Sequence, residues 1–123
     1  MENKINISDA ELEVMKVLWK AGQPITAQEV SRELVNKEWK YSTIATLLGR
    51  MVEKGTATYE KRSRFFYYTP IVSEQDYKSA QTKQFVSSLF NGSVKNLVVS
   101  LFENQEMSEQ DISEIKKLFD LEE

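Results

Sequence analysis

The stretch YSTIATLLGRMVEKG, Tyr41 to Gly55, decides the fold. Its apolar residues recur at i, i+3, i+4, i+7 and i+8, which is the spacing of one buried helix face. They are Ile44, Leu47, Leu48, Met51 and Val52. The opposite face carries Thr43, Thr46, Gly49 and Arg50, where a solvated helix usually carries several Lys and Glu. This outer face is therefore shaped for close approach to another molecule.

Four other helix starts share one pattern, in which a capping hydroxyl is followed three residues later by an acid and then by an apolar residue. The hydroxyls belong to Ser8, Thr26, Ser73 and Ser108. Together with apolar periodicity they predict helices over residues 9–20, 27–36, 41–54, 74–91, 94–102 and from 109 onward. In the first helix we expect Leu12, Met15, Leu18 and Trp19 to face inward.

The period changes after the third helix. Residues 56–70, TATYEKRSRFFYYTP, are rich in Thr, Tyr and Phe, and the polar KRSR in the middle marks a hairpin turn. We expect Phe65 and Tyr67 to form the core face of this hairpin. If the aromatic residues were exposed instead, they would offer a platform on which bases could stack.

Three helices followed by a hairpin with a cationic tip are typical of a winged helix-turn-helix. In that fold the third helix lies in the DNA major groove and the wing meets phosphates or the minor groove. Short hydroxyl and methyl side chains let a helix sit deep in the groove. The predicted DNA contacts are Lys40, Tyr41, Ser42, Thr43, Ala45, Thr46, Gly49, Arg50, Lys54, Arg62 and Arg64. The alternatives are that this face contacts another protein helix and that Arg50 is an ordinary surface cation.

The distribution of charge supports a nucleic-acid partner more than the net charge of -3 does. Residues 37–64 hold seven Lys and Arg against three Asp and Glu, whereas residues 72–123 hold five against ten. A basic middle and an acidic tail suit a protein that docks on DNA in one orientation. Since phosphate contacts release counterions, we expect the affinity to fall steeply with salt.

The composition argues against several other classes of protein. The sequence contains no Cys and no His, which removes thiolate sites, disulfides and the commonest catalytic base and metal ligand. We therefore expect no enzyme activity, no metal and no cofactor. No long apolar run or charged leader precedes the first helix, so we expect a cytoplasmic protein without direct membrane binding.

The C-terminal part reads as a region that needs a partner. Three amphipathic helices of about 50 residues bury too little surface to offset chain entropy alone. Their apolar residues should therefore meet a second copy of the chain, and the predicted dimer contacts are Phe85, Leu89, Val94, Leu97, Val98, Leu101, Phe102, Ile112, Ile115, Leu118 and Phe119. The expected fold is mainly α, with a winged-helix DNA-binding domain at residues 1–71 and a three-helix dimerisation domain at residues 72–123.

The sequence resembles the BlaI/MecI family of bacterial repressors, which comprises penicillinase repressors and copper-responsive relatives of the CopY type. The resemblance rests on ISDAELEVMKVLWK from Ile7, on STIATLLGRMVEKG, on FFYYTP and on SLFNGSVKNLVVSLFENQEMSEQDISEIKKLF. It implies a homodimer of winged-helix domains that represses genes by binding double-stranded palindromic operators with TACA and TGTA half-sites. It also implies, in the penicillinase branch, release when a membrane sensor for β-lactams triggers cleavage within the dimerisation helices.

The chain departs from this family pattern at three places. The family's scissile Asn-Phe bond aligns with Ser100-Leu101, and the cysteine cluster that binds Cu(I) in the copper branch is absent. Lys40 and Tyr41 stand where members often have Ser-Pro, and Ala45 stands where many have Arg, Lys or Gln. We therefore expect a related operator with at least one base contact missing. The competing interpretation is a winged-helix protein-interaction module without operator binding.

Overall fold

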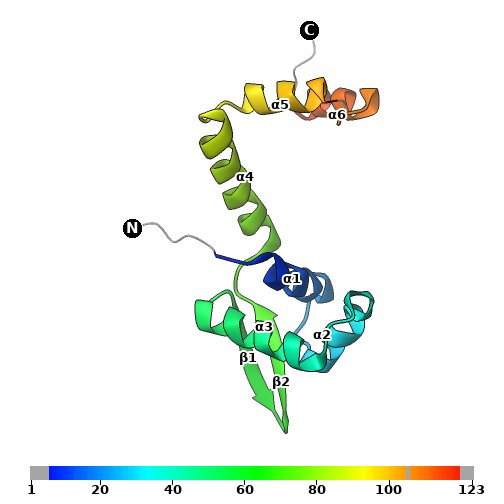
Figure 1. The fold of residues 1–123 in the computed structure, drawn as a ribbon, viewed down its shortest axis with the longest axis vertical. Helices are drawn as coiled ribbons and strands as arrows, with labels where there is room; N and C mark the ends of the chain where they lie inside the picture. The colour runs from blue at the N-terminus through cyan, green and yellow to red at the C-terminus, as the bar shows by residue number, and fades with distance from the viewer. Residues whose placement is uncertain (1–5, 105, 120–123) are drawn as a thin grey trace. The chain divides into compact units, whose positions relative to one another are not determined.

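The computed structural model describes residues 6–104 and 106–119, with the side chains of residues 115–119 outside that description. Along the chain the elements are α1 (Asp9–Ala21), α2 (Ala27–Glu33), the 3₁₀ turn η1 (Val35–Lys37), α3 (Tyr41–Lys54), β1 (Ala57–Arg62), β2 (Phe65–Pro70), α4 (Glu74–Phe90), α5 (Val94–Glu103) and α6 (Glu109–Phe119) (Figure 1). They fall into two compact units, residues 1–80 and 81–123, so that α4 begins in the first unit and continues into the second. The expected winged helix with a helical C-terminal region is confirmed.

The first unit closes a core between three short helices. Each of α1, α2 and α3 contributes buried side chains to this core, and Ile25, Leu34 and Ala57 join them from the segments between and after the helices. The buried residues of the core are Val14, Met15, Leu18, Ile25, Ala27, Val30, Leu34, Ile44, Leu47, Leu48, Met51 and Ala57. The capping boxes predicted at Ser8 and Thr26 are both complete, because each hydroxyl accepts from the backbone three residues on and each acid reaches back. These two caps set where α1 and α2 begin.

Two expectations about these helices need correction. In α1, Met15 and Leu18 are buried and Trp19 packs against the core as expected, whereas Leu12 is only half-buried and the fully buried residues include Val14 and Glu11, which were not expected. The second helix ends at Glu33 rather than at residue 36, and the 3₁₀ turn η1 replaces its last turn. A tighter turn there lets the chain change direction before α3.

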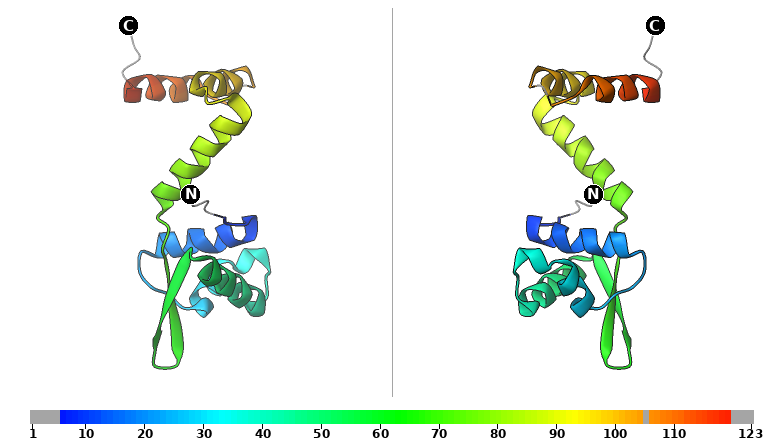
Figure 2. Two further views of the ribbon diagram at one scale, coloured as in Figure 1. Left: turned by 90° about the vertical axis from the view of Figure 1, so that its left-hand side faces the viewer. Right: turned by 90° about the vertical axis from the view of Figure 1, so that its right-hand side faces the viewer.

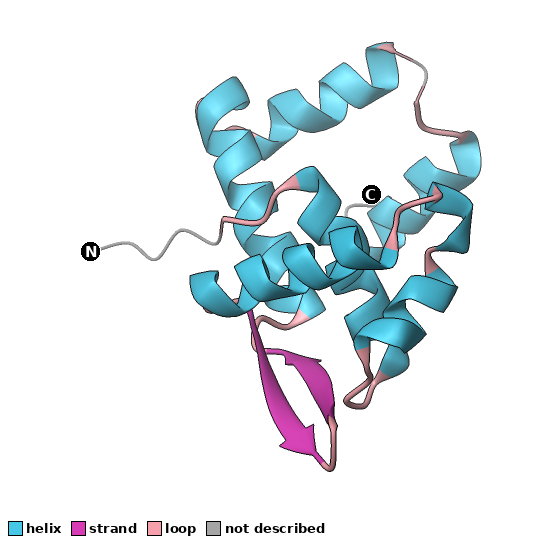
Figure 3. Ribbon diagram, turned by 60° about the horizontal axis from the view of Figure 1, so that its bottom comes forward, coloured by secondary structure: helices cyan, strands magenta, loops and turns pink. Residues whose placement is uncertain are grey.

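The wing is an antiparallel hairpin of β1 and β2 that extends away from the helices (Figures 2 and 3). Its turn is the pair Ser63 and Arg64, and the register sets Arg62 opposite Phe65. The expectation that Phe65 faces the core is wrong, because its side chain is 43 % exposed. Instead Tyr68 packs on the core. Its backbone N–H donates to the Ile25 carbonyl at 2.7 Å and its carbonyl accepts the Ile25 N–H at 3.2 Å, so that Ile25 pairs with β2 like a third strand of one residue.

The second unit leaves most of its apolar side chains in contact with solvent. Among the described residues of the predicted dimer surface, Phe85, Leu89, Val94, Leu101 and Phe102 are exposed, whereas Leu97, Val98 and Ile112 are half-buried. Val86 is the buried residue of α4. The side chains of Ile115, Leu118 and Phe119 lie outside the described residues.

None of the described helices is by itself long and apolar enough to span a membrane. The helices α4 and α5 reach that length and composition only together, as a pair bent by 81°.

Candidate DNA interface

The outer face of α3 is built from short side chains. Ile44, Leu47 and Leu48 turn into the core, which rotates the opposite side of the helix outward. All the residues predicted there are exposed: Ser42, Thr43, Ala45, Thr46, Gly49 and Arg50. A Cβ added at Gly49 would meet no atom within 4 Å, so nothing in the free protein fills the space above it. The helix therefore offers a shallow, hydroxyl-bearing surface that ends in one guanidinium.

The start of α3 meets the base of the wing. Lys40 caps α3 without a side-chain hydrogen bond and is exposed, and Tyr41 follows it with 52 % of its surface exposed. On the wing, the Tyr59 and Tyr68 rings lie 5.8 Å apart. Burial raises the pKa of the Tyr68 phenol above its ordinary value, and the neighbouring Tyr41 and Tyr59 phenols raise it further. The phenol of Tyr41, at the start of α3, is thus close enough to the Tyr68 phenol of the wing to interact with it electrostatically.

The cations of the wing lie close to aromatic rings. Arg62 and Arg64, both predicted, are exposed, and the Arg62 guanidinium carbon lies 5.0 Å from the centroid of the Tyr67 ring. Arg62 also contacts the exposed Glu60 carboxylate at 3.2 Å. Solvent screens such a pair, so it leaves the guanidinium able to exchange this partner for a phosphate.

Four wing residues were missing from the sequence-based set of contacts. Lys61 is exposed with its ammonium 6.0 Å from the Phe66 ring centroid, and Tyr59, Phe65 and Phe66 are 47 %, 43 % and 44 % exposed. These four residues could have been identified from the position of the hairpin turn in the sequence. A two-residue turn at Ser63 and Arg64 places Lys61 opposite Phe66, so both strands carry large side chains to the tip.

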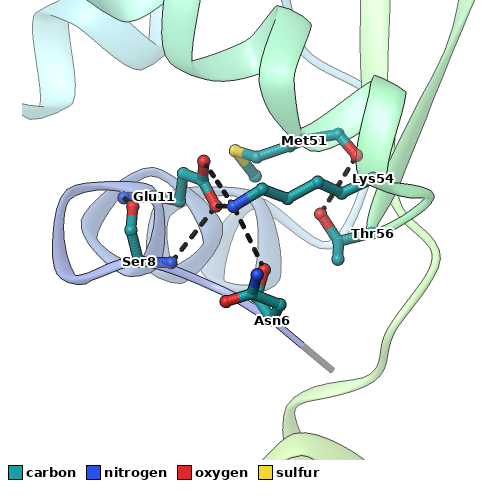
Figure 4. Close-up of polar contacts among 6 residues, drawn as sticks. All are labelled: Asn6, Ser8, Glu11, Met51, Lys54 and Thr56. Atoms are coloured by element: carbon teal, nitrogen blue, oxygen red, sulfur yellow. Dashed lines mark hydrogen bonds and ion pairs between the residues drawn. The ribbon is translucent and has the colours of Figure 1, made fainter. Parts of the chain in front are cut away.

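Lys54, also among the predicted DNA contacts, forms an ion pair within the protein. Its ammonium lies 2.9 and 3.1 Å from the two carboxylate oxygens of Glu11 and donates to the Asn6 carbonyl at 3.3 Å (Figure 4). Glu11 is only 1 % exposed and also accepts the backbone N–H of Ser8. Since moving Lys54 to a phosphate would strand a buried carboxylate, this lysine ties α3 to α1 instead of serving as a free cation.

Within residues 6–104 and 106–119, no group of three or more His, Cys, Asp or Glu could hold a metal ion. The chemistry that this surface does offer is hydrogen bonding from hydroxyls, contact of methyl groups and rings, and cationic contact with anions. These are the interactions by which proteins bind phosphates, sugars and base edges.

The sequence of this chain is similar to a family of known proteins. Residues 7–121 match the family model described as penicillinase repressor. The chain is 38 % identical over 115 residues to the penicillinase repressor of Bacillus licheniformis, which covers 93 % of this chain and 89 % of that protein. It is 30 % identical over 119 residues to the methicillin resistance regulatory protein MecI of Staphylococcus aureus, with 96 % and 97 % covered.

Two solved structures of a repressor each match more than half of this chain. The solution structure of the DNA-binding domain of the repressor BlaI is 48 % identical, has a TM-score of 0.52 and covers 58 % of this chain and 88 % of its own. The Bacillus licheniformis BlaI monomeric form in complex with the blaP half-operator is 47 % identical, has a TM-score of 0.51 and covers 59 % and 89 %.

Proposed function

The chain belongs to the penicillinase repressor family, and from this premise we propose that it represses transcription by binding operator DNA through the outer face of α3 and the wing. The relatives are named as repressors and regulators rather than enzymes. One of the similar structures is a complex with a half-operator. We place the protein in the cytoplasm, where bacterial operator DNA is accessible.

The observation that carries this proposal is the contrast between the two faces of α3. The buried face packs the helix against the core, while Thr43, Thr46 and Gly49 give the exposed face only short side chains. An α-helix fits the major groove only if its outer side chains leave room for the base edges. Arg50 lies a turn further along, where a guanidinium reaches either a phosphate or a guanine edge.

The test measures binding of the full chain to a palindrome with TACA and TGTA half-sites and to a scrambled duplex of equal length, at several salt concentrations. We expect a strong preference for the palindrome and a steep loss of affinity with salt. Arg50→Ala should lower affinity by about 10- to 100-fold, the range for one bidentate or phosphate contact. Lys83→Ala, which removes an exposed cation of α4, is the matched control.

Gly49→Ala separates binding from folding more sharply than a charge removal does. The added methyl meets no atom of the free protein, and Ala favours a helix by about 0.5–1 kcal/mol over Gly. We expect a more stable protein that binds the palindrome less tightly, because the methyl occupies space needed by the groove. Equal binding of palindrome and scrambled DNA by the wild type would favour the protein-interaction module instead.

We further propose that the protein works as a homodimer formed by the second unit. The support is the set of exposed apolar side chains on α4 and α5, among which Leu89, Val94 and Phe102 are 64 %, 62 % and 60 % exposed. Such a surface on short helices is costly in water and is covered in a stable protein. Two linked DNA-binding units gain effective concentration on a palindrome without any new contact.

Sedimentation equilibrium tests the dimer directly. Leu89→Asp and Phe102→Asp place charges on this apolar surface and should convert a dimer to monomers, while affinity for a single half-site stays unchanged. Lys95→Asp changes an exposed residue of α5 and is the control. A wild-type chain that is monomeric at micromolar concentration would refute this part of the proposal.

Release of the operator by a membrane sensor-protease system stays a prediction from the family resemblance. The candidate bond, Ser100-Leu101, lies inside α5, where the Ser100 carbonyl accepts the Asn104 backbone N–H at 3.1 Å and its side-chain amide at 2.8 Å. Proteases bind extended chain, so this part of α5 has to unwind before cleavage. Incubation with the activated sensor, followed by mass spectrometry, tests whether this bond is cut.

A further inference from the structure

The segment between the wing and α4 is held from two sides. The backbone N–H of Ile71 donates to the carbonyl of Thr56 at 2.9 Å, just beyond the end of α3. The indole N–H of Trp19, on α1, donates to the carbonyl of Val72 at 2.8 Å. Thr56 is itself buried and its hydroxyl donates to the Met51 carbonyl at 3.1 Å. The connection is therefore attached both to α1 and to the end of the helix whose outer face is proposed to contact DNA.

The first turn of α4 packs back onto the same indole. Ser73 caps the helix, since its hydroxyl accepts the Asp76 N–H at 3.0 Å and its carbonyl accepts the Tyr77 N–H at 3.0 Å. The Tyr77 ring then lies with its centroid 5.9 Å from that of Trp19, at an interplanar angle of 41°. Aromatic pairs at this separation attract each other beyond the area they bury. Trp19 thus contacts the connection and α4 at once.

The composition of the connection adds to its stiffness. A linker rich in Gly and Ser would leave the start of α4 free to change direction. Here Pro70 has a fixed φ, and Ile71 and Val72 are β-branched with restricted side-chain rotamers. The unit boundary falls after residue 80, so the first turn of α4 belongs to the first unit.

We propose that Trp19 and Tyr77 are positioning residues that fix the direction in which α4 leaves the DNA-binding unit, and that they thereby set the half-site spacing the dimer accepts. This inference rests on the proposed function, in which two copies bind one palindrome. Neither residue is assigned a contact with DNA. Both act through α4, because a helix whose first turn is held cannot pivot freely about its connection.

The physical consequence is that tight binding at one half-site spacing comes with weak binding at other spacings. A held helix concentrates the second DNA-binding unit at one separation, which raises its effective concentration there and lowers it elsewhere. A loosened helix spreads the same unit over several separations. Loosening should therefore weaken binding to the correct spacing, strengthen binding to wrong spacings relative to the correct one, and leave binding to a single half-site unchanged.

The experiment uses the full chain and a series of duplexes. These are a single half-site, the palindrome at the spacing that the wild type binds most tightly, and palindromes with one, two or three base pairs inserted. Tyr77→Ala removes the ring contact, Trp19→Phe removes the hydrogen bond to Val72 while keeping a ring, and Tyr77→Phe keeps the stacking. Lys78→Ala changes the adjacent exposed residue of α4 and is the control.

We expect the preference for the best spacing over the inserted ones to fall by about three- to tenfold in Tyr77→Ala and in Trp19→Phe, the range for one aromatic contact or one hydrogen bond. Tyr77→Phe and Lys78→Ala should keep the wild-type spacing profile. An unchanged profile in Tyr77→Ala and Trp19→Phe would overturn the inference. So would an equal loss on every duplex including the half-site, which marks a purely structural role. A wild type that binds the palindrome no better than a half-site would overturn the proposed dimeric function itself.

Discussion

The two units of this chain solve the same problem of burying apolar surface in opposite ways. In the first unit, α1, α2 and α3 share one core, and Leu48 at its centre has no exposed surface. In the second unit, α5 also carries an apolar stripe, yet its Val94 stays 62 % exposed, and Leu89 of α4 stays 64 % exposed. The difference teaches that a stripe of leucine and valine predicts burial without saying whether the partner lies in the same chain.

The electrostatics of the two units differ in the same sense. Glu11 of the first unit is buried, and its partner Lys54 lies 43 residues later in the sequence, on α3. In the second unit, acids such as Asp111 are exposed and serve their own helix start. Among the described residues, the long-range ion pairs Lys54–Glu11 and Lys37–Glu13 both lie in the unit that closes its own core.

The largest expected effect comes from shortening one leucine in each unit. Leu48→Ala leaves a cavity in a packed core and should lower the free energy of unfolding by about 2–5 kcal/mol. Leu89→Ala should change it by less than about 0.5 kcal/mol while weakening the dimer. Both tryptophans, Trp19 and Trp39, lie in the first unit, so urea unfolding followed by their fluorescence reports that unit. Equal losses from the two variants would break the comparison.

A second test concerns the buried ion pair. Lys54→Met leaves the Glu11 carboxylate buried without its cation, which should cost about 3 kcal/mol of unfolding free energy. Glu11→Gln combined with Lys54→Met should recover much of that loss, because no charge then remains. Lys16→Met removes an exposed lysine of α1 and is the control in the same urea titration. Should Lys54→Met match this control, the link between α1 and α3 carries little energy.

The capping hydroxyls sharpen the comparison at a smaller scale. Thr26→Ala removes the complete capping box of α2 and should cost the first unit about 1 kcal/mol. Ser108 makes the same reciprocal bonds with Asp111 at the start of α6. Ser108→Ala should leave the tryptophan-monitored transition unchanged and lower only the helical signal in circular dichroism. A shift of that transition by Ser108→Ala would mean that the two units unfold together.

The smallest effect is expected at high pH. The pKa of Tyr68 is raised in the folded protein, first by burial and then by Tyr41 and Tyr59, whereas an unfolded tyrosine titrates near pH 10. Above about pH 10 the unfolded chain releases a proton that the folded chain keeps, so stability falls as pH rises. Tyr68→Phe should show a shallower fall in thermal unfolding between about pH 9.5 and 11. Parallel pH profiles for the two proteins would contradict this assignment.

Local patterns predicted much of the fold and of the candidate interface. The apolar spacing of Tyr41 to Gly55 placed the buried and exposed faces of α3 correctly, because a helix has a fixed period of 3.6 residues. The hydroxyl and acid pairs at Ser8 and Thr26 located two helix starts for the same reason, since the partners lie within one turn. The wing was predicted as a hairpin, but its core face was assigned to Phe65 and Tyr67, whereas Tyr68 packs on the core, Phe65 is exposed and Tyr67 is half-buried.

The failures share a cause. Tyr68 packs inward because its backbone pairs with Ile25, a residue 43 positions earlier, and no local alternation encodes that pairing. Lys54 looks like one more cation beside the DNA face until α1 brings Glu11 against it. Trp19 is half-buried, and its ring contacts the Val72 carbonyl and the Tyr77 ring, which both follow the wing in the sequence.

The sequence by itself therefore determined where each helix begins, that a hairpin follows α3 and which face of α3 is left small and exposed. Those properties depend on neighbours within a few residues, whose geometry the backbone period fixes. Only the tertiary structure decided that Lys54 pairs with Glu11, that Tyr68 packs against the core and that α4 starts as part of the first unit. Each of these depends on which distant groups meet when the core closes, and a partner's position in space is not a local property of the chain.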